Sequence, residues 1–111
     1  MPLVSIIIPT FNRADLLPHA VESALSAGED VEVIVVDDGS EDDTPRVCAS
    51  LPGIRYLRLN RNLGTPSARN VGVLHSRAEF VTALGDDDLR LPGSLEAQVR
   101  RLDESPQAAF C

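Results

Sequence analysis

The chain has 111 residues, of which 43% are hydrophobic and 24% are charged, so it can bury the core of one domain. Its formal net charge of -7 disfavours nonspecific binding to nucleic acid or to an anionic membrane, because both partners require clustered basic residues. All ten basic residues are arginine, and the absence of lysine excludes a P-loop lysine and Schiff-base chemistry.

The cysteines and the first residues suggest where the protein works. Cys48 and Cys111 are too few for a disulfide framework and lack the paired spacing of a zinc site. The N-terminus shows neither the basic region nor the cleavage site of a signal peptide, and no apolar run is long enough to span a membrane. We therefore expect a cytoplasmic location, with peripheral association at the inner membrane face as an option.

Short apolar runs alternate with segments of helical periodicity along the whole chain. Pro9 is expected to end the first strand, Asp15 to cap the first helix and Gly28 to end it. This alternation predicts an α/β fold, an open and mostly parallel sheet with helices on both faces. The expected strands are 3–8, 31–36, 54–59, 80–84 and one beginning at 108–111, and the expected helices are 16–25, 44–51, one from 66 and 91–102.

Acidic residues follow two of the predicted strands, at the end of a parallel sheet where ligands bind. One group is Asp37 and Asp38, and the other is residues 86–88, all aspartate. Hard carboxylate oxygens without histidine or cysteine favour Mg2+ or Mn2+, with open positions for substrate phosphates. Asp42 and Asp43 are instead expected to be acids at the start of a helix, where the helix dipole favours them.

A polar loop at residues 60–65 leads into another predicted helix, with Arg69 one turn inside it. Helix N-termini bind anions, and an arginine beside one can hold a diphosphate. The alternatives for Arg69 are a solvated position on the helix or an ion pair with the acidic crevice.

Four separated motifs, taken together, resemble the family 2 glycosyltransferases. They are Val-Ser-Ile-Ile-Ile-Pro-Thr-Phe-Asn at 4–12, Val-Val-Asp-Asp-Gly-Ser at 35–40, Asn-Leu-Gly-Thr-Pro-Ser-Ala-Arg-Asn-Val-Gly at 62–72, and Leu-Gly-Asp-Asp-Asp at 84–88 with Pro92. The resemblance implies the Rossmann-like nucleotide-binding half of a GT-A fold and a nucleotide-diphospho-sugar donor. It also implies a divalent metal, Mn2+ or Mg2+, and transfer with inversion at the anomeric carbon.

The resemblance also implies roles for individual residues. Asp38 would contact the base or ribose of the nucleotide, Asp37 would order the turn, and Arg69 would lie against the base or the diphosphate. The metal would be held by the aspartates after the fourth strand, with Asp87 as the first choice. The implied nucleotide-sugar-binding residues are Pro9, Thr10, Phe11, Asn12, Asp38, Arg69 and Asp86, and the implied metal ligands are Asp87 and Asp88.

Members of this family continue into an acceptor-binding half that supplies a catalytic base, which we expect beyond Cys111. Residues 1–111 are then expected to be the donor-binding part, which binds a nucleotide-sugar but transfers it negligibly. The acceptor could be a saccharide, a lipid or another molecule. The alternative is a noncatalytic nucleotide-sugar-binding module, or a truncated enzyme that lacks its base.

Two other protein classes share the predicted alternation of strands and helices. A signalling receiver domain has an Asp-Asp pair, but it places the pair after its first strand and needs a lysine in its pocket. A dinucleotide-binding oxidoreductase needs Gly-x-Gly-x-x-Gly after the first strand, where this chain has Pro-Thr-Phe-Asn at 9–12. Both classes are therefore disfavoured.

Overall fold

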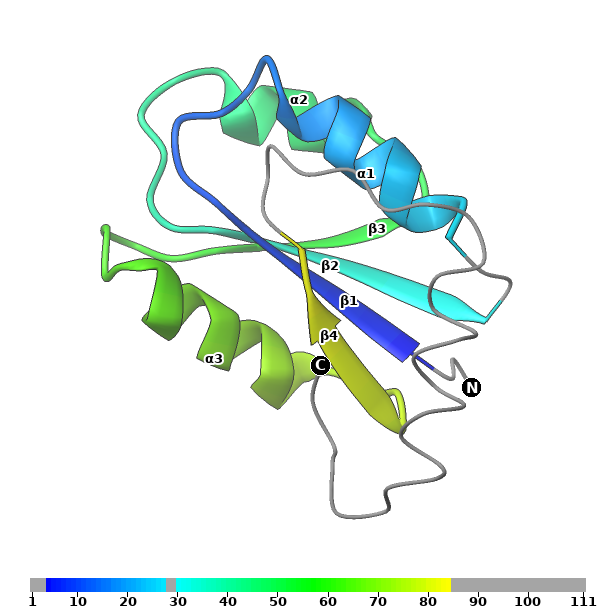
Figure 1. Ribbon diagram of the computed structural model, residues 1–111. Helices are drawn as coiled ribbons and strands as arrows, with labels where there is room; N and C mark the ends of the chain where they lie inside the picture. The colour runs from blue at the N-terminus through cyan, green and yellow to red at the C-terminus, as the bar shows by residue number, and fades with distance from the viewer. Residues whose placement is uncertain (1–3, 28–29, 85–111) are drawn as a thin grey trace.

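A computed structural model describes residues 4–27 and 30–84 as a parallel sheet with helices on both faces (Figure 1). The strand order is β3-β2-β1-β4, and every strand pair is parallel. This confirms the predicted fold class. The expected elements at 91–102 and 108–111, and the aspartates at 86–88, lie outside the described residues. The strands are β1 (Val4–Thr10), β2 (Val31–Asp37), β3 (Ile54–Arg58) and β4 (Phe80–Ala83), and the helices are α1 (Leu17–Leu25), α2 (Thr44–Ser50) and α3 (Thr65–His75).

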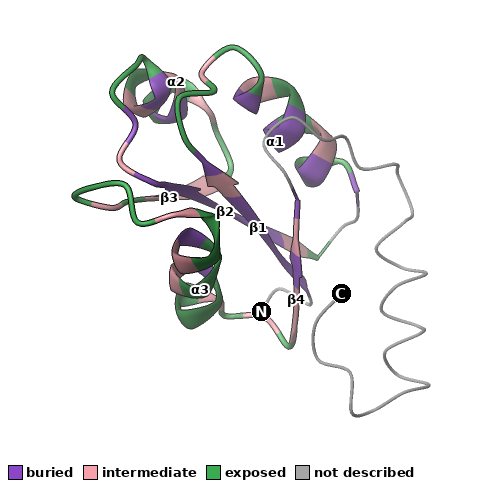
Figure 2. Cartoon of the chain, turned by 60° about the vertical axis from the view of Figure 1, so that its left-hand side comes forward, coloured by how far each residue is buried: buried purple, intermediate pink, exposed green. Residues whose placement is uncertain are grey.

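The two central strands, β1 and β2, are buried almost throughout (Figure 2), which explains why their sequences are nearly continuous apolar runs. Successive residues point to opposite faces of the sheet, so each strand contributes to two cores. Ile6, Ile8, Val33 and Val35 pack with α1 and with Cys48 of α2. On the other face, Ile7, Ile34 and Val36 pack with Ala68 of α3.

Pro9 lies inside β1, so the prediction that it ends the strand was wrong. The carbonyl of Ile7 accepts a hydrogen bond from Leu84 N, so Ile7 faces β4, and Pro9, two residues further on, faces the same side. Because β4 is paired with β1 only as far as Ala83 opposite Ile7, the missing N–H of Pro9 breaks no hydrogen bond of the sheet. Proline is therefore tolerated in a central strand at this position.

The first helix begins later than the sequence suggests. Its N-cap is Leu16, and no side chain caps it, so the prediction that Asp15 is the N-cap was wrong. The N–H groups of Leu16 and Leu17 are instead satisfied by the carbonyl oxygen of Arg13, in a tight turn that precedes the helix. Pro18 lies in the first turn as expected, and Gly28 lies outside the described residues.

At Gly72, the backbone of helix α3 lies closer to the sheet than a residue with a side chain would allow. A Cβ atom added at Gly72 would lie 2.4 Å from Cγ2 of Ile7 and 3.2 Å from Cγ2 of Val36. Glycine at this position therefore lets the helix backbone pack directly onto the two central strands. This close packing fixes the height of α3 above the sheet and so the place of Arg69.

Within residues 4–27 and 30–84, no helix is long and apolar enough to cross a membrane.

Candidate nucleotide-binding site

A pocket of about 350 Å³ opens at the carboxyl ends of β1 and β4. Strands β2 and β3 are added on one side of β1, and β4 is added on the other, so the topology switches direction between β1 and β4. In open α/β sheets, ligands bind at this switch point. The residues that line the pocket are Pro9, Thr10, Phe11, Arg13, Asp38, Thr65, Ala68, Arg69, Ala83 and Leu84.

The structure brings five of the predicted site residues together in this pocket: Pro9, Thr10, Phe11, Asp38 and Arg69. They come from the ends of β1 and β2 and from the second turn of α3, which are far apart in the sequence. Phe11 is 40% exposed, so part of its ring is accessible to a ligand. Their contacts with a nucleotide remain predictions.

Asp38 is buried and holds the loop that leads into α3. Its Oδ1 accepts a hydrogen bond from Leu63 N at 2.7 Å, and its Oδ2 accepts one from Gly64 N at 2.9 Å. A carboxylate has about four acceptor positions, so both oxygens can still accept a further hydrogen bond from a ligand. Asp38 therefore orders the start of α3 in addition to lining the pocket, a role that the sequence did not predict.

The turn after β2 is ordered by Asp37, as predicted. Its Oδ1 accepts a hydrogen bond from Ser40 N at 2.8 Å, and its Oδ2 accepts one from the hydroxyl of Tyr56. Burial, followed by this bond to Asp37, raises the pKa of Tyr56 well above its usual value, so the phenol remains a donor. The fully buried Asp37 therefore acts within the protein and does not line the pocket.

Gly39, in the same turn, allows two loops to touch. Its φ is +77°, and an added Cβ would lie 2.7 Å from the carbonyl carbon of Arg61. A side chain would be strained at this φ and would also collide with the backbone of the opposite loop. This close approach brings the N–H groups of residues 63 and 64 within reach of Asp38.

Asn12 lies beside the pocket but is not among the residues that line it. Its backbone N–H donates to Ser40 Oγ, and its side-chain Oδ1 accepts from Glu41 N, both at 2.9 Å. Its φ of +54° is in the left-handed region, which asparagine tolerates better than most residues. In this structure Asn12 joins the loops after β1 and β2, whereas the sequence placed it in the nucleoside pocket.

Several residues that line the pocket were missed, of which Arg13 is the most important. It directly follows the motif at the end of β1, and its side chain is exposed. Its position next to Asn12 could have identified it as a candidate. Thr65, Ala68 and Leu84 belong to the motifs at 62–72 and 84–88, but the motifs predicted no role for them individually, and Ala83 lies outside the motifs. The packing of α3 and β4 against β1 brings all four to the pocket.

Metal binding in the described part of the chain has little support, since no group of three histidine, cysteine or acidic residues there could hold an ion. The oxygens of Asp37 and Asp38 accept hydrogen bonds from protein donors. The predicted ligands, Asp87 and Asp88, follow Leu84 of the pocket wall within a few residues but lie outside the described residues, as does Asp86. Their carboxylates are the hard oxygen donors that Mn2+ and Mg2+ prefer.

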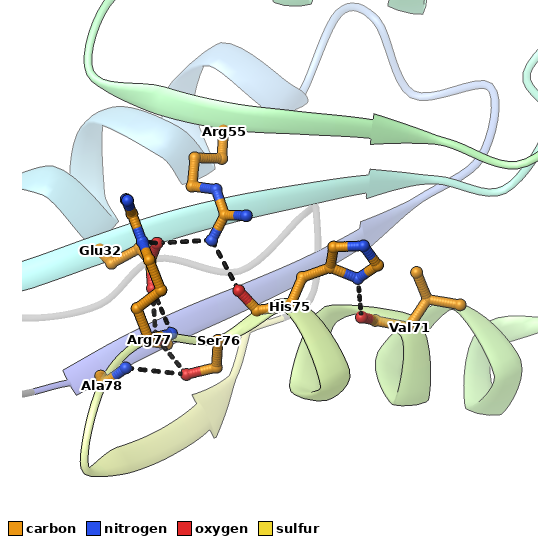
Figure 3. Close-up of polar contacts among 8 residues, drawn as sticks. Glu32, Arg55, Val71, His75, Ser76, Arg77 and Ala78 are labelled. Carbon is orange, nitrogen blue, oxygen red and sulfur yellow. Dashed lines mark hydrogen bonds and ion pairs between the residues drawn. The ribbon is translucent and has the colours of Figure 1, made fainter.

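A second polar cluster is centred on Glu32 (Figure 3). It lies at the amino ends of the strands, whereas the pocket opens at the carboxyl ends of β1 and β4. The Glu32 carboxylate, 4% exposed, accepts hydrogen bonds from Ser5 Oγ, Arg55 Nη1, and both Nε and N of Arg77. Burial alone would raise its pKa, but the bonds from Arg77, Arg55 and Ser5 prevail and lower it to about 2. The cluster joins β1, β2 and β3 to the segment between α3 and β4, and we assign it a structural role.

Two further groups also have structural explanations. Asp42 accepts hydrogen bonds from Thr44 at the start of α2 and from Ala14 N. Burial opposes its ionisation, but these bonds lower its pKa, in line with the expected role at a helix start. Burial, followed by the charge of Asp37, raises the pKa of the Cys48 thiol to about 12, so this cysteine is a core residue and not a nucleophile.

Comparison with known proteins identifies the family. The sequence profile of glycosyl transferase family 2 matches residues 5–111. The chain is 39% identical over 106 residues to the succinoglycan biosynthesis protein ExoO of Rhizobium meliloti. This match covers 93% of the chain and 30% of that protein. It is 40% identical over 116 residues to the GalNAc(5)-diNAcBac-PP-undecaprenol beta-1,3-glucosyltransferase of Campylobacter jejuni, a match that spans 99% of this chain and 38% of that enzyme.

Among solved structures, S. aureus TarS 1-349 in complex with UDP-GlcNAc superposes with a TM-score of 0.81 at 28% identity. The match covers 92% of this chain and 31% of the TarS chain. The chain thus spans about a third of the length of these three relatives. It belongs to glycosyl transferase family 2, as its four motifs had indicated.

Proposed function

We propose that this family 2 chain binds a nucleotide-diphospho-sugar in the pocket between β1 and β4, as the donor site of an inverting glycosyltransferase. The observation that carries the proposal is the convergence of Pro9, Thr10, Phe11, Asp38 and Arg69 on one pocket at the switch point of the sheet. The complex of TarS with UDP-GlcNAc, a relative with the same fold, supports a nucleotide-sugar as the ligand class.

In this proposal different residues of the pocket bind different parts of the ligand. Phe11 and Asp38 receive the nucleoside, through the exposed ring and the remaining acceptor positions of the carboxylate. Arg69 binds the diphosphate and stabilises the negative charge that develops on it as the bond to the sugar breaks. A divalent ion held by the aspartates at 86–88 would neutralise part of the same charge.

The catalytic base has no candidate among the residues that line the pocket. Asp38 is the acid in that wall, and both of its oxygens already accept backbone hydrogen bonds. Inverting transfer needs a base that removes the acceptor proton during attack. We therefore propose that the base, and with it the acceptor site, comes from outside the described residues.

Titration of four nucleoside diphosphates tests the donor site. Uridine, guanosine, thymidine and cytidine diphosphates are titrated into the protein by calorimetry, in Mn2+ and in chelator. We expect one of them to bind, and to bind more tightly with Mn2+. Arg69→Ala should weaken binding of the diphosphate about tenfold or more and binding of the free nucleoside much less, because a hydrogen bond to a charged group contributes about 1.5–3 kcal/mol. Failure of all four to bind would contradict the proposal.

The metal assignment is tested separately with Asp87→Asn, which should remove the advantage of Mn2+ and leave the metal-free affinity unchanged. The matched control is Asp43→Asn, which removes the same charge from a side chain that is 75% exposed and does not line the pocket. Equal affinity of the wild-type protein in Mn2+ and in chelator would contradict the assignment. Residues 1–111 are expected to bind the nucleotide-sugar but to transfer it negligibly, and steady metal-dependent transfer to an acceptor by these residues alone would contradict a base beyond Cys111.

A further inference from the structure

The arginines of the described residues fall into two groups. Four of them lie within 4.0 Å of a carboxylate oxygen: Arg46, Arg55, Arg58 and Arg77. The other three, Arg13, Arg61 and Arg69, have exposed side chains and no carboxylate partner among residues 4–27 and 30–84. Arg13 and Arg69 both line the pocket, whereas Arg61 does not. Two arginines without a described acidic partner therefore line the same pocket.

The backbone of Arg13 is held in place before any ligand binds. Its carbonyl oxygen accepts hydrogen bonds from Leu16 N at 3.1 Å and Leu17 N at 2.9 Å. Its neighbours, Asn12 and Ala14, are bound to the turn after β2, through Ser40 Oγ, Glu41 N and Asp42 Oδ2. Only the side chain of Arg13 has to be ordered when it binds a ligand, which lowers the entropic cost of the contact.

The two arginines reach the pocket from different sides of the sheet. Arg13 belongs to the connection from β1 to α1, and Arg69 lies in α3. Helices α1 and α3 cover opposite faces of the sheet (Figure 1). The ligand group that binds both must therefore offer acceptors in two directions.

The charge of the pocket wall favours an anion. Two arginines stand against a single described carboxylate, Asp38, whose charge is already stabilised by two backbone N–H groups. A diphosphate carries oxygens on two phosphorus atoms, and each phosphate can accept hydrogen bonds from a separate guanidinium. A nucleoside offers no such group, and a monophosphate offers one.

We propose that Arg13 is a second phosphate-binding residue of this site, and that Arg13 and Arg69 together select a nucleoside diphosphate over the monophosphate. This inference rests on the proposed function, since it assigns a further residue to the same donor site. It makes Arg13 the main source of diphosphate binding on the α1 side of the pocket.

The test measures binding of one nucleotide series to wild-type protein and to Arg13→Ala. The series is the nucleoside diphosphate that the wild-type protein binds most tightly, its monophosphate and its nucleoside, each titrated in Mn2+ and in chelator. We expect Arg13→Ala to weaken binding of the diphosphate about tenfold or more and to change nucleoside affinity by less than about twofold. Arg13→Gln, which keeps most of the side chain without the charge, should give the same pattern and serves if Arg13→Ala is poorly folded.

Arg61→Ala is the matched control, because it removes the same charge from an exposed arginine outside the pocket. It should change diphosphate affinity by less than about twofold, through long-range electrostatics alone. Equal effects of the Arg13 and Arg61 substitutions would overturn the inference, as would an Arg13 variant that loses nucleoside and diphosphate affinity alike. If the wild-type protein binds no nucleotide, the donor site and this inference both fail, which is distinguishable from failure of Arg13 alone.

Discussion

Replacing Asp38 by asparagine separates its two roles, as an anchor of the loop before α3 and as a wall of the pocket. The substitution keeps the size of the side chain but turns one of its two oxygens into an amide group. That amide must face either Leu63 N or Gly64 N, both of which are donors. One hydrogen bond is therefore lost, and the other loses its charge.

The size of the effect follows from the same two contacts. Hydrogen bonds to a charged group contribute about 1.5–3 kcal/mol each, and neutral ones about 1 kcal/mol. Leu63 is 48% exposed, so water replaces part of what its N–H loses and the lower part of this range applies. We expect Asp38→Asn to lower the free energy of unfolding by about 2 kcal/mol, or the melting temperature by roughly 10 °C.

Urea denaturation followed by circular dichroism measures this loss, and calorimetry measures nucleotide binding by the same variant. Because the loop positions Thr65 and Arg69, we expect diphosphate affinity to fall about tenfold as well. Asp43→Asn is again the control and should change neither quantity by much, since exposed ion pairs contribute about 0–1 kcal/mol. Unchanged stability of Asp38→Asn would refute the role of Asp38 as the anchor of this loop.

Two further predictions concern stability. The pKa of Glu32 falls from about 4.5 to about 2 on folding. Its ionised carboxylate therefore stabilises the folded protein above pH 4.5, and this stabilisation is lost as the pH falls from 4.5 to about 2. Between pH 4.5 and 2 the free energy of unfolding of the wild-type protein should fall by about 2 kcal/mol, and that of Glu32→Gln should fall distinctly less. Urea denaturation at each pH measures both, and parallel curves of unfolding free energy against pH would contradict this prediction. Gly72→Ala should destabilise the protein by about 1–3 kcal/mol, despite alanine's better helix propensity, because the added methyl group collides with Ile7. A more stable Gly72→Ala variant would mean that α3 can move away from the sheet without cost.

Strands and helices could be predicted from the sequence because their signals are local. The apolar runs at 31–36 and 80–84 become β2 and β4 with boundaries that differ by one residue, because strands inside a parallel sheet are recognised by short, mainly apolar runs. The errors at Pro9 and Asp15 have the opposite cause. Pro9 is acceptable in β1 only because β4 stops short of it, and the cap expected from Asp15 is replaced by the carbonyl oxygen of Arg13.

The sequence by itself determined the α/β alternation, the family, and half of the residues that line the pocket, because parallel strands bring their carboxyl ends to one edge of a sheet. Only the tertiary structure decided that β4 lies beside β1, that Asp38 holds the loop before α3, and that Arg13 lines the same pocket as Arg69. Each of these depends on contacts between residues more than 20 positions apart, where the strand order and the close approach at Gly39 and Gly72 set the geometry. Local patterns carry no record of such contacts, because a residue's preference for strand or helix does not specify its distant neighbours.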